Sequence, residues 1–143
     1  MDPRLNFITL AVADVAAARA FYVDGLGWTP AFEMPGDIMF IKLSPTLVLS
    51  LWRRSEFEVE VGTVAERHGL LPFTLAHNVP SPEAVDAVLR DVEAAGGTIR
   101  QPATLRDWGG YSGYFSDPAG FVWEVAYNPG PIGMALMEAE GLA

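Results

Sequence analysis

Cysteine is absent from the 143 residues of this chain. Its absence excludes disulfide bonds, thiolate metal sites and cysteine nucleophiles. Basic residues are also scarce, because nine lysines and arginines stand against eighteen aspartates and glutamates, which gives a formal net charge of −9 at pH 7. A nucleic-acid-binding surface needs clustered basic side chains that displace counterions from phosphates. The composition therefore predicts that nucleic acid is not a partner.

Long apolar runs are missing as well. No stretch approaches the ~18–20 consecutive apolar residues of a membrane span. The first residues, Met1–Phe7, lack the basic flank and apolar run of a signal peptide. We therefore expect a soluble, cytoplasmic protein with no membrane partner. Half of the residues are nonetheless hydrophobic, so a chain of this length can bury the core of one domain.

The first part of the chain predicts one helix among several strands. Alternating apolar residues predict a strand over Phe7–Val12, and Asp14 then stands at the N-cap of an alanine-rich helix over Val15–Asp24. Gly25 and Gly27 are suited to end that helix. Three extended segments follow, separated by breaks that contain glycine or proline: Trp28–Met34, Ile38–Leu43 and Leu47–Trp52. The predicted order is β-α-β-β-β.

The same order then begins again. A strand is expected over Phe73–Val79, and Ser81 caps a helix that closes at Gly96-Gly97. A short extended piece near Thr98–Gln101 and a hairpin follow. Aligning Val12 with Val79 places the helix cap Asp14 against the helix cap Ser81. We therefore interpret the chain as an internal duplication.

Domain boundaries follow from this duplication. We predict a single domain over 1–143, built from module 1 over about 4–53, a connection over 54–71, module 2 over about 72–128 and a tail over 129–143. A connection of that length is typical of a lid, a binding loop or a linker between repeats. The tail has the pattern of a short amphipathic packing or dimer element.

The stretch Tyr111–Asn128 predicts a β-hairpin around the turn Asp117–Gly120, where Asp-Pro opens the turn and glycine supplies a positive φ. Alternation in the second arm places Glu124 on one face with Val122 and Ala126. This carboxylate in an apolar strand has two interpretations. It is either a general acid or base with a pKa raised by desolvation, or an acceptor for hydrogen bonds from side chains or a ligand amine.

A set of segments carries a resemblance to a known family: Ala20–Tyr22, Leu26–Trp28 and Phe115–Glu124, together with the Asp-capped helix and the duplication. In this order they resemble the vicinal-oxygen-chelate superfamily, which includes glyoxalase I, extradiol dioxygenases and bleomycin-resistance proteins. The resemblance runs from about residue 5 to about residue 130. It implies an α+β fold in which two paired β-α-β-β-β modules form a cupped, incomplete barrel that holds the ligand. It also implies a homodimer.

The resemblance further implies where a metal would bind. In metal-dependent members the first and fourth strands of both modules supply the ligands. Carried onto this chain, these positions are Phe7, Ser50, Thr74 and Glu124. Only Glu124 is a competent ligand for a divalent ion, because phenylalanine has no donor atom and neutral hydroxyls do not replace imidazoles. We therefore expect a degenerate site that needs no metal, and no other cofactor.

Residues of the expected cup and its loops form the predicted ligand site. Aromatic side chains there are candidates for stacking on a planar or cationic ligand, although strand aromatics also serve as core. The candidate ligand-binding residues are Phe7, Ser50, Trp52, Thr74, Asn78, Trp108, Tyr111 and Tyr114. Glu124 is the candidate catalytic residue. Alternation places His77 on the helix side, which indicates a structural role.

The expected function is binding of a small amphiphilic or aromatic molecule. Two alternatives stay open at this stage. One is an enzyme of the glyoxalase or dioxygenase type, a lyase, isomerase or oxygenase that uses displaced metal ligands or a metal-free Glu124. The other is a dimeric interaction module with a vestigial cup.

Overall fold

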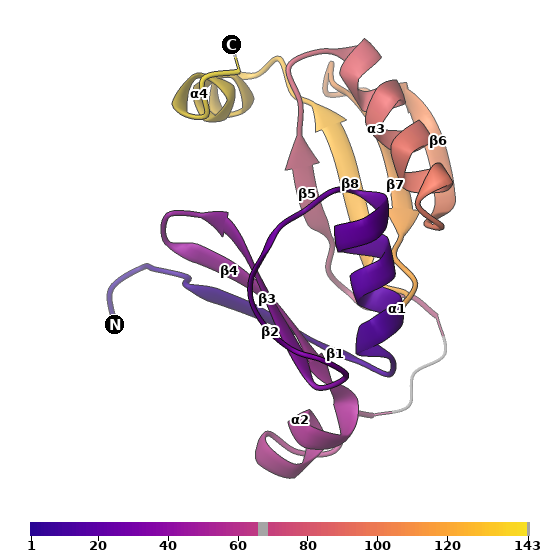
Figure 1. Cartoon of the computed structure of the whole chain (residues 1–143). Coiled ribbons are helices and arrows are strands. Elements are labelled where there is room, and N and C mark those ends of the chain that lie inside the picture. The colour runs from indigo at the N-terminus through magenta and orange to yellow at the C-terminus, as the bar shows by residue number, and fades with distance from the viewer. Residues whose placement is uncertain (66–68, 143) are drawn as a thin grey trace. The chain divides into compact units, whose positions relative to one another are not determined.

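The computed structural model describes residues 1–65 and 69–142. The chain divides into two compact units, Met1–His68 and Gly69–Ala143. Each unit holds one four-stranded sheet (Figure 1). Residues 66–68, which belong to the predicted connection, lie outside the described residues.

The first unit carries sheet 1, whose strand order is β1-β4-β3-β2. Strand β1 runs parallel to β4, and the other neighbours are antiparallel. The elements in chain order are β1 (Phe7–Val12), α1 (Val15–Arg19), the π-helix η1 (Ala20–Gly25), β2 (Pro30–Met34), β3 (Ile38–Ser44), β4 (Leu47–Arg53) and α2 (Arg54–Glu60).

The second unit carries sheet 2, whose strand order is β5-β8-β7-β6, with β5 parallel to β8. Its elements are β5 (Leu75–Asn78), α3 (Pro82–Ala94), β6 (Thr98–Leu105), β7 (Tyr111–Ser116), β8 (Val122–Tyr127) and α4 (Pro131–Ala139). In both sheets the strands lie in the order first, fourth, third, second. The predicted α+β fold with a repeated β-α-β-β-β order is therefore confirmed.

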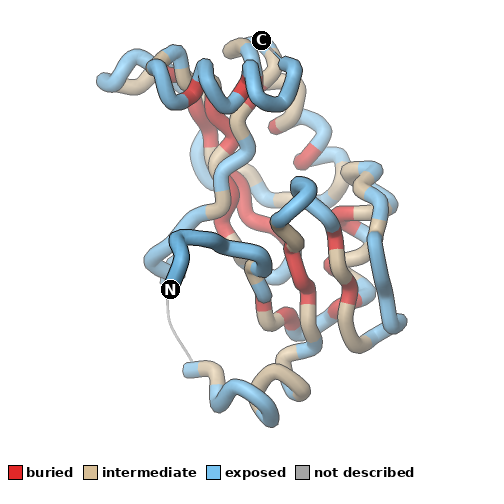
Figure 2. The backbone as a smooth tube through the Cα atoms, turned by 90° about the vertical axis from the view of Figure 1, so that its left-hand side faces the viewer, coloured by how far each residue is buried: buried red, intermediate tan, exposed pale blue. Residues whose placement is uncertain are grey.

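Alternation along the strands of sheet 1 sends one set of side chains under α1, which packs against β3 and β4. Leu51 on β4 lies between Leu10 on β1 and Met39 on β3, and none of the three is more than 3% exposed. Buried residues concentrate along the strands (Figure 2). Asp14 caps α1, because its Oδ1 accepts a hydrogen bond from the Ala17 amide at 3.0 Å.

Sheet 2 is covered in the same way by α3, which packs against β6, β7 and β8 (Figure 1). Val125 on β8 is fully buried on this face. Gly113 on β7 lets the helix approach closely, since a Cβ at that position would stand 2.7 Å from Leu89 Cδ1. Ser81 caps α3 through a hydrogen bond from the Ala84 amide. We call the face of each sheet that is turned away from α1 or α3 its far face.

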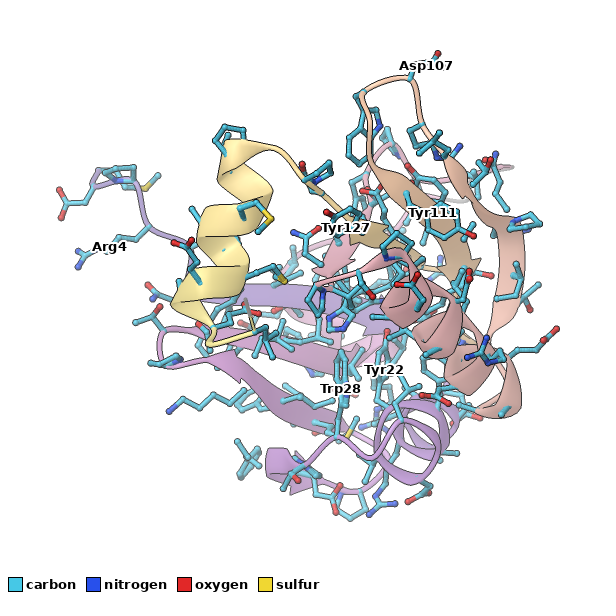
Figure 3. The ribbon with its side chains drawn as sticks, turned by 90° about the horizontal axis from the view of Figure 1, so that it is seen from above. Arg4, Tyr22, Trp28, Asp107, Tyr111 and Tyr127 are labelled. Carbon is cyan, nitrogen blue, oxygen red and sulfur yellow. The ribbon has the colours of Figure 1, made fainter. Side chains whose placement is uncertain are left out.

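The first helix differs from the single helix expected over Val15–Asp24. After α1 the chain widens into η1, as the hydrogen bond from the Leu26 amide to the Phe21 carbonyl at 2.9 Å shows. The Tyr22 ring then packs on Trp28 at 5.3 Å (Figure 3). A 3.6-residue hydrophobic period carries no signal for an extra residue in one turn, so the sequence pattern did not predict η1.

The predicted connection begins with a helix, α2. An i,i+4 pair between Arg54 and Glu58 supports this helix, and both side chains also bind the backbone of Val64. Three strands differ by two residues or more from the prediction, and β2 begins at Pro30 instead of Trp28. Strand β6 extends over Thr98–Leu105 because it follows β7 through two register irregularities, and β5 begins only at Leu75.

The predicted tail contains a short helix, α4, with Pro131 in its first turn. Across the described residues, no helix combines the length and the apolar character that crossing a bilayer requires.

Candidate functional site

Glu124 lies in the middle of the far face of sheet 2. It pairs with Tyr114 on β7 and with Ala76 on β5, so these three side chains lie on one face. The Tyr114 hydroxyl donates a hydrogen bond to Glu124 Oε1 at 2.7 Å. Both side chains are half-buried. The sequence predicted the carboxylate and the tyrosine separately, and the register brings them together.

Arg106 holds the other side of Tyr114. Its guanidinium lies over the Tyr114 ring, with Cζ 5.4 Å from the ring centroid. Its Nε donates to Ser112 Oγ and its Nη2 to the Ser112 carbonyl, both at 2.9 Å. Ser112 is fully buried. Arg106 was not among the predicted site residues. The sequence signal that could have identified it is the strand alternation, which puts its partners Ser112 and Tyr114 on the face of Glu124.

The hydroxyl of Tyr114 stays protonated at neutral pH. Its hydrogen bond to Glu124 raises the pKa of Tyr114, and partial burial adds to the effect. Ser112 and the positive charge of Arg106 oppose the shift. Tyr114 is therefore a hydrogen-bond donor to the carboxylate.

Tyr111, a second candidate ligand-binding residue, lies away from Tyr114. Its hydroxyl donates to Asp86 Oδ1 on α3 at 3.0 Å, so it lies on the helix-covered face. The hydrogen bond to Asp86 raises the pKa of Tyr111. Tyr111 and Tyr114 therefore lie on opposite faces of sheet 2, because residues three apart on a strand point to opposite faces. No sequence signal identified Asp86.

Strand β5 borders Glu124 on its other side. Asn78 pairs with Ala126, is half-buried and lies on the far face, as expected. Thr74 precedes β5 and is exposed, whereas the sequence predicted it within the strand. His77 pairs with Val125 on the helix side, where desolvation lowers its pKa while Glu140 opposes the shift.

Trp108 lies in the loop between β6 and β7, whose tip carries Asp107 (Figure 3). The indole is 53% exposed. Its ring covers Gly110, since a Cβ on that glycine would overlap the Trp108 ring atoms. Trp108 is thus a loop side chain, as predicted, and it packs on its own hairpin.

The far face of sheet 1 is mostly apolar and also carries Lys42 of β3, which pairs with Val48. The Phe40 ring lies 5.5 Å from that of Phe7 and 5.4 Å from that of Phe32, and Phe7 is 50% exposed. Trp52 lies on the same face and packs edge-on against Phe57 of α2 at 5.9 Å. Ser50 lies among them and is buried. This face presents aromatic surface and no charged group beside Phe7 that resembles Glu124.

The four positions that the resemblance equates with metal ligands carry few donor atoms. Phe7 offers no donor atom, and its ring is engaged with Phe40. Ser50 and Thr74 are neutral hydroxyls, and Glu124 already accepts from Tyr114. Within residues 1–65 and 69–142, no three or more histidine, aspartate and glutamate side chains are grouped so as to hold an ion. A stable site needs three or four such donors.

Comparisons with known proteins agree on one family. The model of the Glyoxalase/Bleomycin resistance protein/Dioxygenase superfamily matches residues 4–125. The chain is similar to the crystal structure of a glyoxalase-related enzyme from Fulvimarina pelagi, with 36% identity, a TM-score of 0.80 and 89% of each chain covered. A comparison with curated proteins found no significant match.

Two further solved structures have the same fold. A glyoxalase/bleomycin resistance protein/dioxygenase from Nocardioides is 25% identical, with a TM-score of 0.75 over 91% of this chain and 87% of that one. A lactoylglutathione lyase from Agrobacterium tumefaciens is 26% identical, with a TM-score of 0.67 over 88% and 94%. The chain therefore belongs to the Glyoxalase/Bleomycin resistance protein/Dioxygenase superfamily.

Proposed function

We propose that this protein binds a small amphiphilic or aromatic molecule without a metal, and that the ligand contacts the far face of sheet 2 at Glu124 and Tyr114. One observation carries the proposal. The carboxylate at the last metal-ligating position accepts a hydrogen bond from Tyr114 at 2.7 Å, while Phe7, Ser50 and Thr74 occupy the other positions. This combination supports binding without a metal, with the polar pair as the ligand contact.

The composition of the far faces supports a ligand of mixed character. Sheet 1 offers aromatic surface at Phe7, Phe32 and Phe40, and such rings bury a large apolar area on contact. Sheet 2 offers the Tyr114–Glu124 pair. The proposal includes that the protein is a homodimer. The cytoplasmic location stays a prediction from the sequence.

The test is a titration with three naphthalene derivatives, an amidine, an amide and a carboxylate, before and after dialysis against a chelator. Elemental analysis of the same samples measures the metal content per chain. We expect at least one derivative to bind with an unchanged affinity after dialysis. Loss of binding on dialysis, together with about one ion per chain beforehand, would contradict metal-free binding.

A second candidate function is metal-free acid–base catalysis. The observation that favours it is the neutral phenol of Tyr114 directly beside the Glu124 carboxylate, because a base and an acid in contact suit proton transfer. A structural relative is named a lactoylglutathione lyase. The test is formation of lactoylglutathione by the wild-type chain and by Glu124→Gln. Turnover that Glu124→Gln abolishes would favour this candidate, whereas no turnover by the wild type would remove it.

A further inference from the structure

We infer that Glu124 and Tyr114 present hydrogen-bond acceptors only, and that they select a ligand whose amidinium or primary ammonium group donates to them. Arg106 and Tyr114 act here as positioning residues for the carboxylate. The inference rests on the proposed function and names the chemical class of its ligand.

The first step is a count of donors. A tyrosine hydroxyl has one proton, and in Tyr114 that proton is committed to Glu124 Oε1. An ionised carboxylate has no proton to donate. What remains for a ligand is Oε2 of Glu124 and the second lone pair of the phenol oxygen, and both accept. A ligand that offers only acceptors, such as a carboxylate or phosphate, finds no partner at this pair.

The second step concerns charge. The ion pairs between described side chains involve Arg4, Arg19, Arg53 and Arg54, and none of them includes Glu124. Its one hydrogen bond comes from a neutral phenol. A half-buried carboxylate with a single neutral partner gains from a cation, because a charge-assisted hydrogen bond is about twice as strong as a neutral one. The net charge of −9 attracts cations as well.

The third step concerns preorganisation. Ser112, which is fully buried, holds Arg106 through two hydrogen bonds, and Arg106 lies against the Tyr114 ring. The phenol oxygen is thereby fixed, and with it the orientation of the carboxylate. On the opposite side Glu124 faces Ala76, an exposed residue with only a methyl group. That side leaves room for a ligand group, and a fixed acceptor binds with less loss of side-chain entropy.

The experiment measures dissociation constants of naphthamidine, naphthamide and naphthoate, which share one ring system and differ in charge and donors. We expect the wild type to bind naphthamidine at least about tenfold more tightly than the other two. Naphthyltrimethylammonium carries the charge without an N–H group, and we expect it to bind less tightly than naphthamidine.

Two variants and a matched control locate the effect. Glu124→Gln should reduce the preference for naphthamidine over naphthamide about tenfold. Tyr114→Phe keeps the ring and its contact with Arg106, and it should reduce naphthamidine affinity about threefold because the carboxylate loses its fixed orientation. Tyr111→Phe removes the same kind of hydrogen bond on the helix-covered face, and it should leave the preference unchanged. Circular dichroism confirms that each variant is folded.

The outcomes separate the inference from the proposed function. Equal affinity for naphthamidine, naphthamide and naphthoate would overturn the inference. It would not contradict metal-free binding. Tighter binding of naphthoate assigns the ligand anchor to Arg106 and also overturns it. Equal binding of naphthamidine and naphthyltrimethylammonium overturns the requirement for a donor, and tighter binding by Tyr114→Phe overturns the positioning role. Failure of every probe to bind contradicts both proposals.

Discussion

The two sheets share one strand order but have different far faces. In sheet 1 the far face is built from phenylalanine rings, with Phe40 between Phe7 and Phe32. In sheet 2 the corresponding face carries a carboxylate, a phenol and a guanidinium in contact. Their helix-covered faces, by contrast, are both apolar and almost fully buried: aliphatic residues such as Leu51 line that of sheet 1, and Val125 with the stacked rings of Phe115 and Trp123 lines that of sheet 2. The duplicated part of the molecule is the core, and the difference is confined to the surfaces available for binding.

This difference teaches that a repeated fold constrains only the residues that pack under the helix. The covered face must exclude water, so both modules bury apolar side chains there. The far face need not exclude water to the same degree, and the two modules carry different side chains there. Four predictions test this division, from the largest expected effect to the smallest.

The largest effect is expected for Leu51→Ala on the covered face of sheet 1. Leu51 is fully buried, and its truncation leaves a cavity that lowers the free energy of unfolding by about 2–5 kcal/mol. Phe40→Ala on the far face is the control and should cost about 1 kcal/mol, since Phe40 is only half-buried. Chemical denaturation measures both. A Phe40 variant as unstable as the Leu51 variant would show that the far face is also core.

The second prediction compares the tight turns of the two modules. Asp117 is 4% exposed, and its Oδ1 accepts from the amides of Ala119 and Phe121. Asp117→Ala leaves those amides without this partner and should cost about 1–3 kcal/mol. In the first module Ser44 makes a single bond to the Thr46 amide at 3.3 Å, so Ser44→Ala should stay within about 0.5 kcal/mol. Equal losses of stability for Asp117→Ala and Ser44→Ala, measured by thermal unfolding, would contradict the expected difference between the two turns.

The third prediction concerns the equivalent helix caps. Asp14 and Ser81 each accept one amide hydrogen bond at the start of their helices. Replacing either with alanine should lower stability by about 1 kcal/mol. Asp14→Asn and Ser81→Thr keep an oxygen acceptor and serve as controls with smaller losses. A cap variant with no effect in one module would show that its helix is held by packing alone.

The smallest effect is a change in tyrosine titration. The folded pKa values of Tyr111 and Tyr114 are both raised, by hydrogen bonds to Asp86 and Glu124 respectively. Because the folded values exceed the unfolded one, the stability from each bond is complete below about pH 10 and is lost as pH rises through the folded pKa. Ultraviolet titration of phenolate should show an earlier onset for Asp86→Asn and Glu124→Gln than for the wild type. An unchanged curve for Glu124→Gln would contradict the Tyr114 contact.

The sequence predicted most of the fold because its signals are local. Asp14 and Ser81 identified two helix starts, and strand alternation identified the buried faces. It gave no bounds for α2 within the predicted connection, since part of the support of α2 comes from the later residue Val64. It missed η1, because the extra residue of η1 leaves no periodic trace. It also shortened β6, whose length is set by pairing with β7.

For the site, the sequence by itself determined which chemistry is available. Positions 7, 50 and 74 carry a phenylalanine and two neutral hydroxyls, and Glu124 supplies the carboxylate. Only the tertiary structure decided which side chains act together. The cross-strand register places Tyr114 beside Glu124, to which it donates a hydrogen bond. Tyr111 instead donates to Asp86 on α3. Such pairings depend on which strand or helix lies next to which, and that is a property of long-range contacts rather than of local sequence.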